Sequence, residues 1–338
     1  MSLKSLTSKD LIQFVNTRKG EQKLGENIHT LAYGDLNELD TLKENGARFC
    51  LLGIPESIGV RGNLGNQGTE LAWPAFLTSF LNVQGNRFLS GDSFVVLGQV
   101  DVEDLRDELT LFNSTPAEVA QKARKLCEAV DERVTPIISS VIKAGLIPIV
   151  IGGGHNNAYP LLKGVAKALN TTAGINAINL DAHADFRSLE GRHSGNGFSY
   201  AKNEGFLNRY FAFGLHQSYN SENILSAMDQ DRDVAYSFFE DISNFDVALK
   251  EALAFVDDKE TPVGIELDMD AIKSMPSSAI SPSGVTLEQA RAYVRECASQ
   301  LNVAYLHLPE AAPSNSAENG FVGKALSYLV TDFAKSSL

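Results

Sequence analysis

Short, almost wholly apolar runs that end in polar or glycine residues are the feature that most restricts how this chain can fold. The runs lie at residues 50–55, 147–151, 175–180, 210–215, 263–267 and 303–308. Strands that are apolar on both faces are typical of a parallel sheet with helices on each side, because neither face then contacts water. The sequence therefore predicts an α/β protein.

Helix signals lie between these runs. A capping-box pattern at Thr115 opens a helix that runs toward residue 144, with a kink or break expected at Pro136, and a second capping box begins at Thr286. Further helix candidates are residues 157–169 and 316–334. Strands that alternate with helices imply one open, mostly parallel sheet, whose ligands bind at the carboxyl ends of the strands.

The first 45 residues differ from the rest because they are polar and carry scattered glycines. They are predicted to form an N-terminal extension (residues 1–45) of short helices and loops, packed on a main α/β domain of residues 46–338.

Charge and composition exclude several classes of protein. Lys and Arg number 29 and Asp and Glu number 42, which gives a net charge of −13 and disfavours nucleic acid or an anionic membrane as a partner. No apolar run approaches the roughly 18 residues that a membrane-spanning helix needs. The N-terminus lacks the apolar core of a secretory signal, so a cytoplasmic location is expected. The 3 cysteines are far apart, which predicts neither a disulfide framework nor a Cys-rich zinc site.

Two strand ends carry patterned acids. Asp181, His183 and Asp185 alternate with alanines, and Asp268 and Asp270 follow another apolar run. Side chains two residues apart point to the same face of an extended chain, so each set is expected to converge. Acids that converge in a buried place repel one another unless a cation lies between them.

A third strand end supplies His155, directly after three glycines, and Glu266 precedes Asp268 on the same face. The candidate ligands are His155, Asp181, His183, Asp185, Asp268 and Asp270. These are more ligands than one ion needs, so we expect a pair of divalent ions bridged by carboxylates. The oxygen-rich set favours Mn²⁺ over Zn²⁺ and leaves other divalent metals open. Taken singly, an Asp pair can cap a helix and a buried His can be a core residue. The glycines match no phosphate-binding motif.

The combined motifs resemble those of a known family. The matching segments are Gly153-Gly154-His155, Asp181-Ala182-His183-Ala184-Asp185, Asp268-Met269-Asp270 and the glycine-rich loop of residues 53–65. Over roughly residues 50–334 the chain resembles the ureohydrolases, which include arginase, agmatinase and formimidoylglutamase. The resemblance implies a three-layer, arginase-like α/β sandwich with a mostly parallel sheet of about eight strands, two Mn²⁺ ions and a homo-oligomer. It also implies that His155 and Asp185 hold one ion, that His183 and Asp270 hold the other, and that Asp181 and Asp268 bridge them.

Departures from the family pattern point to one subgroup. Arginases and agmatinases typically have Asp at the position of Gly154, and a guanidinium-binding Glu at the position of Gln289. Arginases have a proton-shuttling His where this chain has Phe198. A neutral amide cannot pair with a guanidinium charge, and Gln289 is better explained as part of the capping box. The loop of residues 275–282 and the Asp185-Phe186-Arg187 pattern are similar to formimidoylglutamases.

Further residues receive roles from this resemblance, each weighed against a purely structural one. Arg187 is the main candidate ligand for a substrate carboxylate, and Arg192 and Arg61 are further candidates, with surface salt bridges as the alternative. Candidates for binding the amino-acid end of a substrate are Ser194 and Asn196, and candidates for relaying protons are His193 and His216. Glu310 is grouped with the substrate-binding candidates, and it is expected to order the other residues of the site. His307 is given no functional role.

The predicted function is metal-assisted hydrolysis of a carbon–nitrogen bond in a formimidoyl or amidine group. Formimidoylglutamate would give glutamate and formamide, with Asp185 passing the proton to the leaving nitrogen. Two alternatives stay open: an arginase- or agmatinase-like guanidino hydrolase that releases urea, and a non-catalytic metal-binding scaffold.

Overall fold

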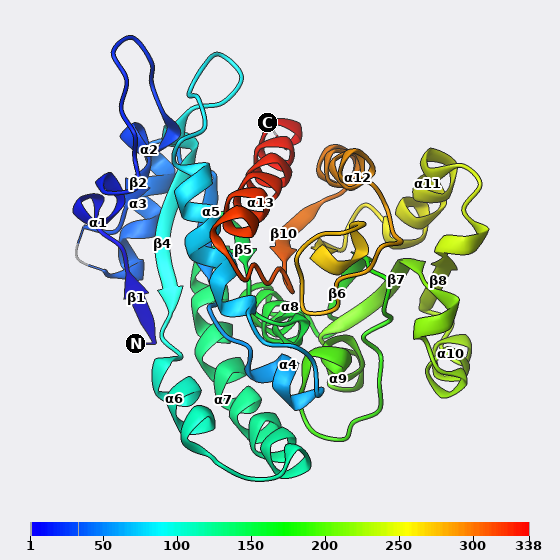
Figure 1. Cartoon of the computed structure of the whole chain (residues 1–338). Coiled ribbons are helices and arrows are strands. Elements are labelled where there is room, and N and C mark those ends of the chain that lie inside the picture. The colour runs from blue at the N-terminus through cyan, green and yellow to red at the C-terminus, as the bar shows by residue number, and fades with distance from the viewer. Residues whose placement is uncertain (1, 33, 338) are drawn as a thin grey trace.

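A single large sheet runs through the protein, with helices on both faces (Figure 1). The computed structural model describes residues 2–32 and 34–337. The strands of this described part are β1 (Leu3–Ser5), β2 (His29–Thr30), β3 (Phe49–Gly53), β4 (Phe94–Val100), β5 (Ile147–Ile151), β6 (Ile175–Leu180), β7 (Leu207–Leu215), β8 (Val234–Phe238), β9 (Val263–Leu267) and β10 (Val303–Leu308). Their order is β1-β4-β3-β5-β10-β9-β6-β7-β8, with β2 also paired to β4. Strands β3 to β10 pair in parallel, which confirms the predicted parallel sheet of eight strands.

The N-terminal segment is more than the predicted helices and loops. Its strand β1 pairs antiparallel with β4, and β2 pairs in parallel with β4, so the described sheet has ten strands. Strands of three and two residues leave no apolar run in the sequence, which is why the pattern did not predict them.

Helices between the strands cover the two faces of the sheet. They are α1 (Ser8–Ile12), α2 (Leu24–Asn27), α3 (Leu39–Glu44), α4 (Ile58–Gly62), α5 (Ala72–Phe80), α6 (Glu103–Leu111), α7 (Pro116–Lys143), α8 (Ala158–Leu169), α9 (Gly197–Asn203), α10 (Glu222–Asp229), α11 (Phe245–Val256), α12 (Leu287–Gln300) and α13 (Ser316–Ser336). Helix α7 begins with the predicted capping box at Thr115 and continues past Pro136 without ending there.

The core has two apolar layers, one on each face of the sheet. Leu51 packs in the layer with α5, α11, α12 and α13, whereas its neighbour Leu52 packs in the layer with α7, α8 and α9. Successive side chains of a strand point to opposite faces, so a strand that is apolar throughout fills both layers. This arrangement confirms the three-layer fold class.

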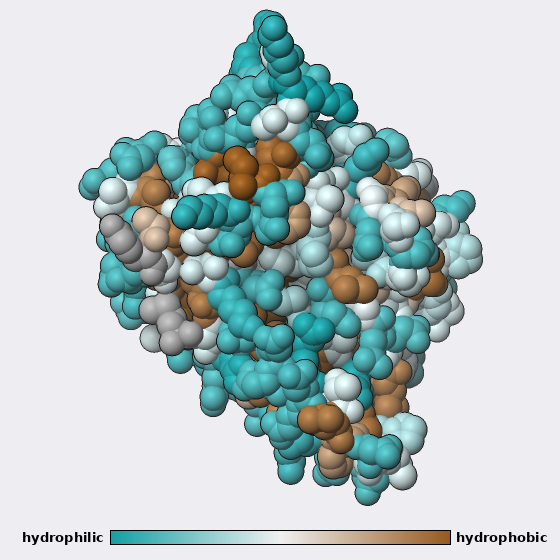
Figure 2. Space-filling view, turned by 60° about the vertical axis from the view of Figure 1, so that its left-hand side comes forward, coloured by the Kyte–Doolittle hydropathy of each residue, from teal (hydrophilic) through white to brown (hydrophobic). Residues whose placement is uncertain are grey.

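The face of the protein shown in Figure 2 is mainly hydrophilic, and its hydrophobic residues form small groups among hydrophilic ones. Cys50, Cys127 and Cys297 are free and buried, as expected for small core residues. Among the described residues, no helix combines the length and apolar character needed to cross a membrane.

Four neighbouring strands in the middle of the sheet position the candidate site. In the order β5-β10-β9-β6 they are parallel, so their carboxyl ends meet at one edge. His155 follows β5, Asp181 follows β6, Asp268 follows β9 and Glu310 follows β10. Side chains from distant parts of the sequence are thereby brought together where ligands of open α/β sheets bind.

Candidate metal centre

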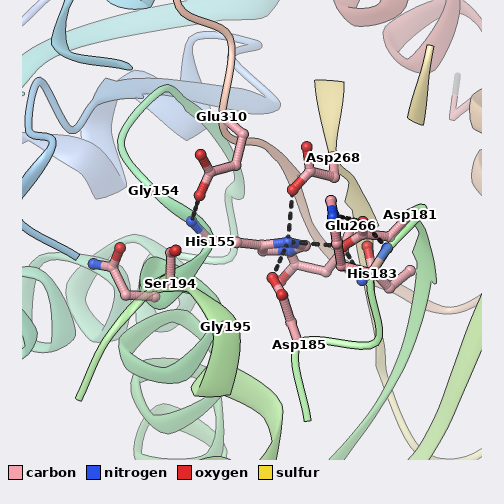
Figure 3. A network of polar contacts seen from close by, with 12 residues as sticks. Gly154, His155, Asp181, His183, Asp185, Ser194, Gly195, Glu266, Asp268 and Glu310 are labelled. Atoms are coloured by element: carbon pink, nitrogen blue, oxygen red, sulfur yellow. Dashed lines mark hydrogen bonds and ion pairs between the residues drawn. The ribbon is translucent and has the colours of Figure 1, made fainter. Parts of the chain in front are cut away.

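Three carboxylates converge on one nitrogen of His155. Its Nδ1 atom lies 2.9 Å from Asp185 Oδ2, 3.1 Å from Asp268 Oδ2 and 3.2 Å from Asp181 Oδ2 (Figure 3). His155 and Asp181 are fully buried. We call His155, Asp181, Asp185 and Asp268 the inner group.

A second set of ligand atoms shares Asp181 with the first. His183 Nδ1 lies 3.2 Å from Asp270 Oδ2 and 3.6 Å from Asp181 Oδ1. We call Asp181, His183 and Asp270 the outer group. The two oxygens of Asp181 face different groups, which is the geometry of a bridging carboxylate.

The donor set fits two divalent cations. A ring nitrogen can donate one hydrogen bond at most, yet three carboxylate oxygens surround His155 Nδ1. The buried Asp270 Oδ1 has no hydrogen-bond partner among the described residues. Carboxylate oxygens with two imidazoles suit Mn²⁺.

Electrostatics supports the same conclusion. Burial lowers the pKa of His155, but the carboxylates of Asp181, Asp185 and Asp268 outweigh it and raise this pKa well above its ordinary value. Burial and the charge of Asp181 raise the pKa of Asp185 to about 6. The clustered carboxylates are therefore stabilised by nearby positive charge, which protons or metal ions can supply.

The turn before His155 needs glycine, because two of its residues have a backbone conformation that other residues rarely adopt. Gly152 and Gly153 have φ values of +79° and +75°, which favour glycine, and a Cβ on Gly153 would lie 2.5 Å from Asn157 Nδ2. The buried Glu56 accepts hydrogen bonds from the Gly154 N–H at 3.0 Å and from Asn157 Nδ2 at 2.7 Å. Sequence reasoning missed Glu56, although it lies in the glycine-rich loop that carried part of the family resemblance.

Glu310 contacts the backbone of His155, so it can fix the position of this residue. Its Oε1 atom accepts a hydrogen bond from the His155 N–H at 2.8 Å, and its other oxygen accepts one from the Ser278 hydroxyl. Burial raises the pKa of Glu310 to about 8. Glu310 and Asp185 have φ values of +66° and +45°, so two non-glycine residues at the site occupy the left-handed region. Backbone strain of this kind persists where the surroundings hold a residue for function.

A small cavity opens beside the two groups. Its volume is about 150 Å³, and its lining includes Asp185, Arg187, Ser194, Tyr219 and Glu310. Arg187 is the one Lys or Arg among the described residues that line it. The Arg187 side chain is 48% exposed and makes a single ion pair, with Glu190 at 3.2 Å. The structure therefore brings Arg187 and Ser194, both predicted substrate ligands, to the cavity.

Arg192 and Asn196 do not reach the cavity, so the structure does not support their predicted substrate contacts. Arg192 is buried, with Nε 2.9 Å from Asp131 Oδ2 and Nη1 donating to Asn196 Oδ1 at 3.0 Å. Both side chains make several hydrogen bonds inside the protein, where they hold the loop that carries Ser194. Arg61 does not line the cavity either.

The two predicted proton relays are also absent from the cavity lining. His193 is buried and accepts a hydrogen bond from the Gly195 N–H at 3.1 Å. Burial and the charges of Arg124 and Arg187 lower the pKa of His193 to about 4. His216 is buried against aromatic rings.

Two departures from the arginase pattern have structural counterparts. Phe198 packs edge-on against the ring of His155, with centroids 5.2 Å apart, so this position lies in the interior. Gln289 completes the capping box of α12, where its Oε1 accepts a hydrogen bond from the Thr286 N–H at 2.8 Å.

The fold and site define a class: α/β proteins with a cluster of acids and imidazoles at the carboxyl ends of parallel strands. The arginase family model matches residues 47–334, and the chain therefore belongs to the arginase family.

Among the individual relatives that the chain resembles are formimidoylglutamases from two bacteria. The chain is 29% identical over 285 residues to the formimidoylglutamase of Geobacillus thermodenitrificans, covering 82% of this chain and 81% of the relative. It is 27% identical over 266 residues to the formimidoylglutamase of Macrococcus caseolyticus, covering 78% and 77%.

Solved structures show the same fold. Formimidoylglutamase from Bacillus subtilis matches with a TM-score of 0.75 and 18% identity, covering 95% of this chain and 93% of that one. Trypanosoma cruzi formiminoglutamase with Mn²⁺ matches with a TM-score of 0.71 and 18% identity, covering 94% and 98%.

Proposed function

We propose that this protein is a dinuclear manganese hydrolase that converts N-formimidoylglutamate and water into glutamate and formamide. The observation that carries the proposal is the pair of ligand groups sharing Asp181 beside a cavity that Arg187 lines. The curated relatives reported above are formimidoylglutamases, and the departures at Gly154, Phe198 and Gln289 disfavour a guanidino substrate.

The ligand roles follow from the two groups. We assign one ion to His155 and Asp185 and the other to His183 and Asp270, and Asp181, which belongs to both groups, would be shared. The resemblance to the family adds Asp268 as a second shared ligand. Two divalent ions held there would lower the pKa of a bound water to about 7 and would supply positive charge near the reacting carbon. The turn that Glu56 holds and the backbone contact of Glu310 fix His155 before substrate arrives.

Arg187 is the group we assign to a substrate carboxylate. Its ion pair with Glu190 is single and half-exposed, and Glu190 also contacts Arg124 at 3.3 Å and His193 at 3.2 Å. Arg187 can therefore turn to a substrate carboxylate without leaving Glu190 unpaired. A guanidinium pairs with a carboxylate through two parallel hydrogen bonds, which fixes the orientation of the substrate.

Asp185 is the group to which we assign the proton transfer. The water oxygen bonds to the formimidoyl carbon, and the bond from that carbon to the glutamate nitrogen breaks. The leaving nitrogen takes a proton, which yields the free amine of glutamate and neutral formamide. Asp185 lies at the cavity and next to His155, so it can accept the proton from water and deliver it to this nitrogen.

The test uses the purified, Mn²⁺-loaded protein with formimidoylglutamate, arginine and agmatine as separate substrates. We expect equal amounts of glutamate and formamide from the first and no urea from the other two. Urea from arginine or agmatine would instead establish a guanidino hydrolase. A protein that holds Mn²⁺ and turns over none of the three would contradict the proposed function and favour a metal-binding scaffold.

We also propose a cytoplasmic location and a homo-oligomeric assembly, which the sequence predicts. Cell fractionation tests the first. Size-exclusion chromatography with light scattering tests the second, and a mass equal to one chain would contradict it.

A further inference from the structure

A buried polar cluster lies behind His155, on the side away from the cavity. It consists of Glu266 from β9 with Tyr305 and His307 from β10, and each is 0% exposed. Tyr305 Oη donates to Glu266 Oε1 at 2.6 Å, and His307 Nδ1 lies 2.6 Å from Glu266 Oε2. The sequence placed Glu266 on the face of Asp268 without a role and gave His307 none.

This cluster meets the ring of His155 on its second nitrogen. His155 Nδ1 faces the carboxylates of the inner group, whereas His155 Nε2 lies 3.3 Å from Glu266 Oε2 (Figure 3). A neutral imidazole that binds metal through Nδ1 must carry its proton on Nε2. His155 Nε2 is buried and makes no regular hydrogen bond among the described residues, so the Glu266 carboxylate beside it is the group that can favour a proton on this nitrogen and orient the ring.

Glu266 is itself held in place by two neighbouring side chains. The Tyr305 hydroxyl contacts one of its oxygens, and the His307 ring contacts the other. A carboxylate held through both of its oxygens has a fixed position, here with Oε2 beside the ring of His155.

We propose that Glu266 is a positioning residue, which holds His155 in the tautomer and orientation that bind the inner-group ion, and that His307 and Tyr305 hold Glu266. This inference rests on the metal site of the proposed function and is independent of which substrate is cleaved. His155, Glu266 and His307 are also close enough to hold a further cation between them. The metal count distinguishes that arrangement.

The experiment compares Mn²⁺ binding to the wild-type protein and to the Glu266→Gln variant by equilibrium dialysis across free Mn²⁺ concentrations. Wild-type protein is expected to bind two ions per chain. The variant keeps the size of the side chain but loses its charge. We expect one of the two Mn²⁺ dissociation constants to rise about 10- to 100-fold, as is typical when a metal-ligating residue loses the side chain that orients it. Excess Mn²⁺ should restore activity.

The matched control is Asp131→Asn, which also neutralises a buried carboxylate but contacts Arg192 outside the metal centre. It should lower the melting temperature and leave both dissociation constants unchanged. Tyr305→Phe removes one hydrogen bond to Glu266 and should give a smaller loss than Glu266→Gln. Where Glu266→Gln fails to fold, His307→Gln serves instead, with the same single weakened site expected.

Other results overturn the inference. Unchanged dissociation constants in Glu266→Gln would show that Glu266 does not position His155. A loss no larger than that of Asp131→Asn, or one shared equally by both sites, would show an effect through general stability. Three ions per chain in the wild type, falling to two in His307→Gln, would assign the cluster to a metal site of its own. Wild-type protein that binds no Mn²⁺ would refute the proposed function itself.

Discussion

The inner and outer groups of the metal centre are built very differently. His155, in the inner group, is fully buried and contacts polar side chains through both ring nitrogens. His183, in the outer group, has a 33% exposed side chain, faces the cavity and stacks on Tyr219. The difference teaches that a bridged pair of sites can combine one rigid, enclosed position with one open to solvent. We therefore expect slower metal exchange at the inner group.

Asp181→Ala should disrupt metal binding in both the inner and the outer group, because Asp181 is the ligand that the two groups share. We expect loss of both Mn²⁺ ions and a fall in activity greater than the roughly 100-fold that loss of an outer partner costs. Metal analysis of the dialysed protein and steady-state kinetics measure this. The control is Asp270→Asn, which should lose one ion and keep the other. Activity that survives Asp181→Ala would contradict the site assignment.

Arg187→Met should weaken substrate binding in the cavity without changing any of the assigned metal ligands. Hydrogen bonds to charged groups contribute about 1.5–3 kcal/mol, so KM for formimidoylglutamate should rise roughly 10- to 100-fold. Mn²⁺ content should stay at the wild-type value, as measured by metal analysis. Arg124→Met is the matched control, because Arg124 contacts the same Glu190 but does not line the cavity. An equal rise in KM in both variants would mean that Arg187 acts only through Glu190.

A parallel sheet follows from the sequence pattern, and its strand order brings the ends of β6 and β9 to one edge of the sheet. The expected alternation in an extended chain is not what makes the acids converge, because β6 ends at Leu180 and Asp185 has a φ of +45°. Asp270 likewise lies in a short 3-10 helix, Met269–Ala271, directly after β9. Short N-terminal strands gave no such pattern and were missed.

Roles that depend on side-chain direction could not be predicted. Arg192 and Arg187 lie five residues apart in the same loop, yet one turns inward to Asp131 and the other toward the cavity. Nothing in their spacing distinguishes the two. The contacts of Glu56 join residues about 100 positions apart, so only the folded chain shows them.

Acid should weaken the loop beside the open half through His193. Its pKa in the folded protein, about 4, lies below the ordinary 6.5. Between these pH values the unfolded chain binds a proton that the folded protein does not, so the free energy of unfolding falls as pH drops from 6.5 to 4. One pKa unit corresponds to about 1.4 kcal/mol. Because Glu190 shares the imidazole proton and is partly exposed, we expect a loss of about 2 kcal/mol.

The measurement is urea denaturation of wild-type protein and of His193→Gln at pH 7 and at pH 4.5, both with bound Mn²⁺. Acid-driven metal release affects both proteins, so the difference between them isolates the imidazole. The wild type should lose more stability than the variant. Parallel losses would show that His193 is protonated equally easily in the folded and unfolded chains.

Tyr219 should produce the smallest effect, and it tests whether the outer group also depends on a supporting side chain. Its ring lies nearly parallel to the rings of His183 and His216, with centroids 5.2 and 5.1 Å away. An aromatic pair contributes about 0.5–1.5 kcal/mol, so Tyr219→Leu should weaken Mn²⁺ binding at one site roughly two- to tenfold. Tyr219→Phe keeps the ring and should bind like the wild type. If Phe weakens binding as much as Leu, the hydroxyl contact with Ser281 at 3.4 Å supports the outer group, because the stacked ring is still present.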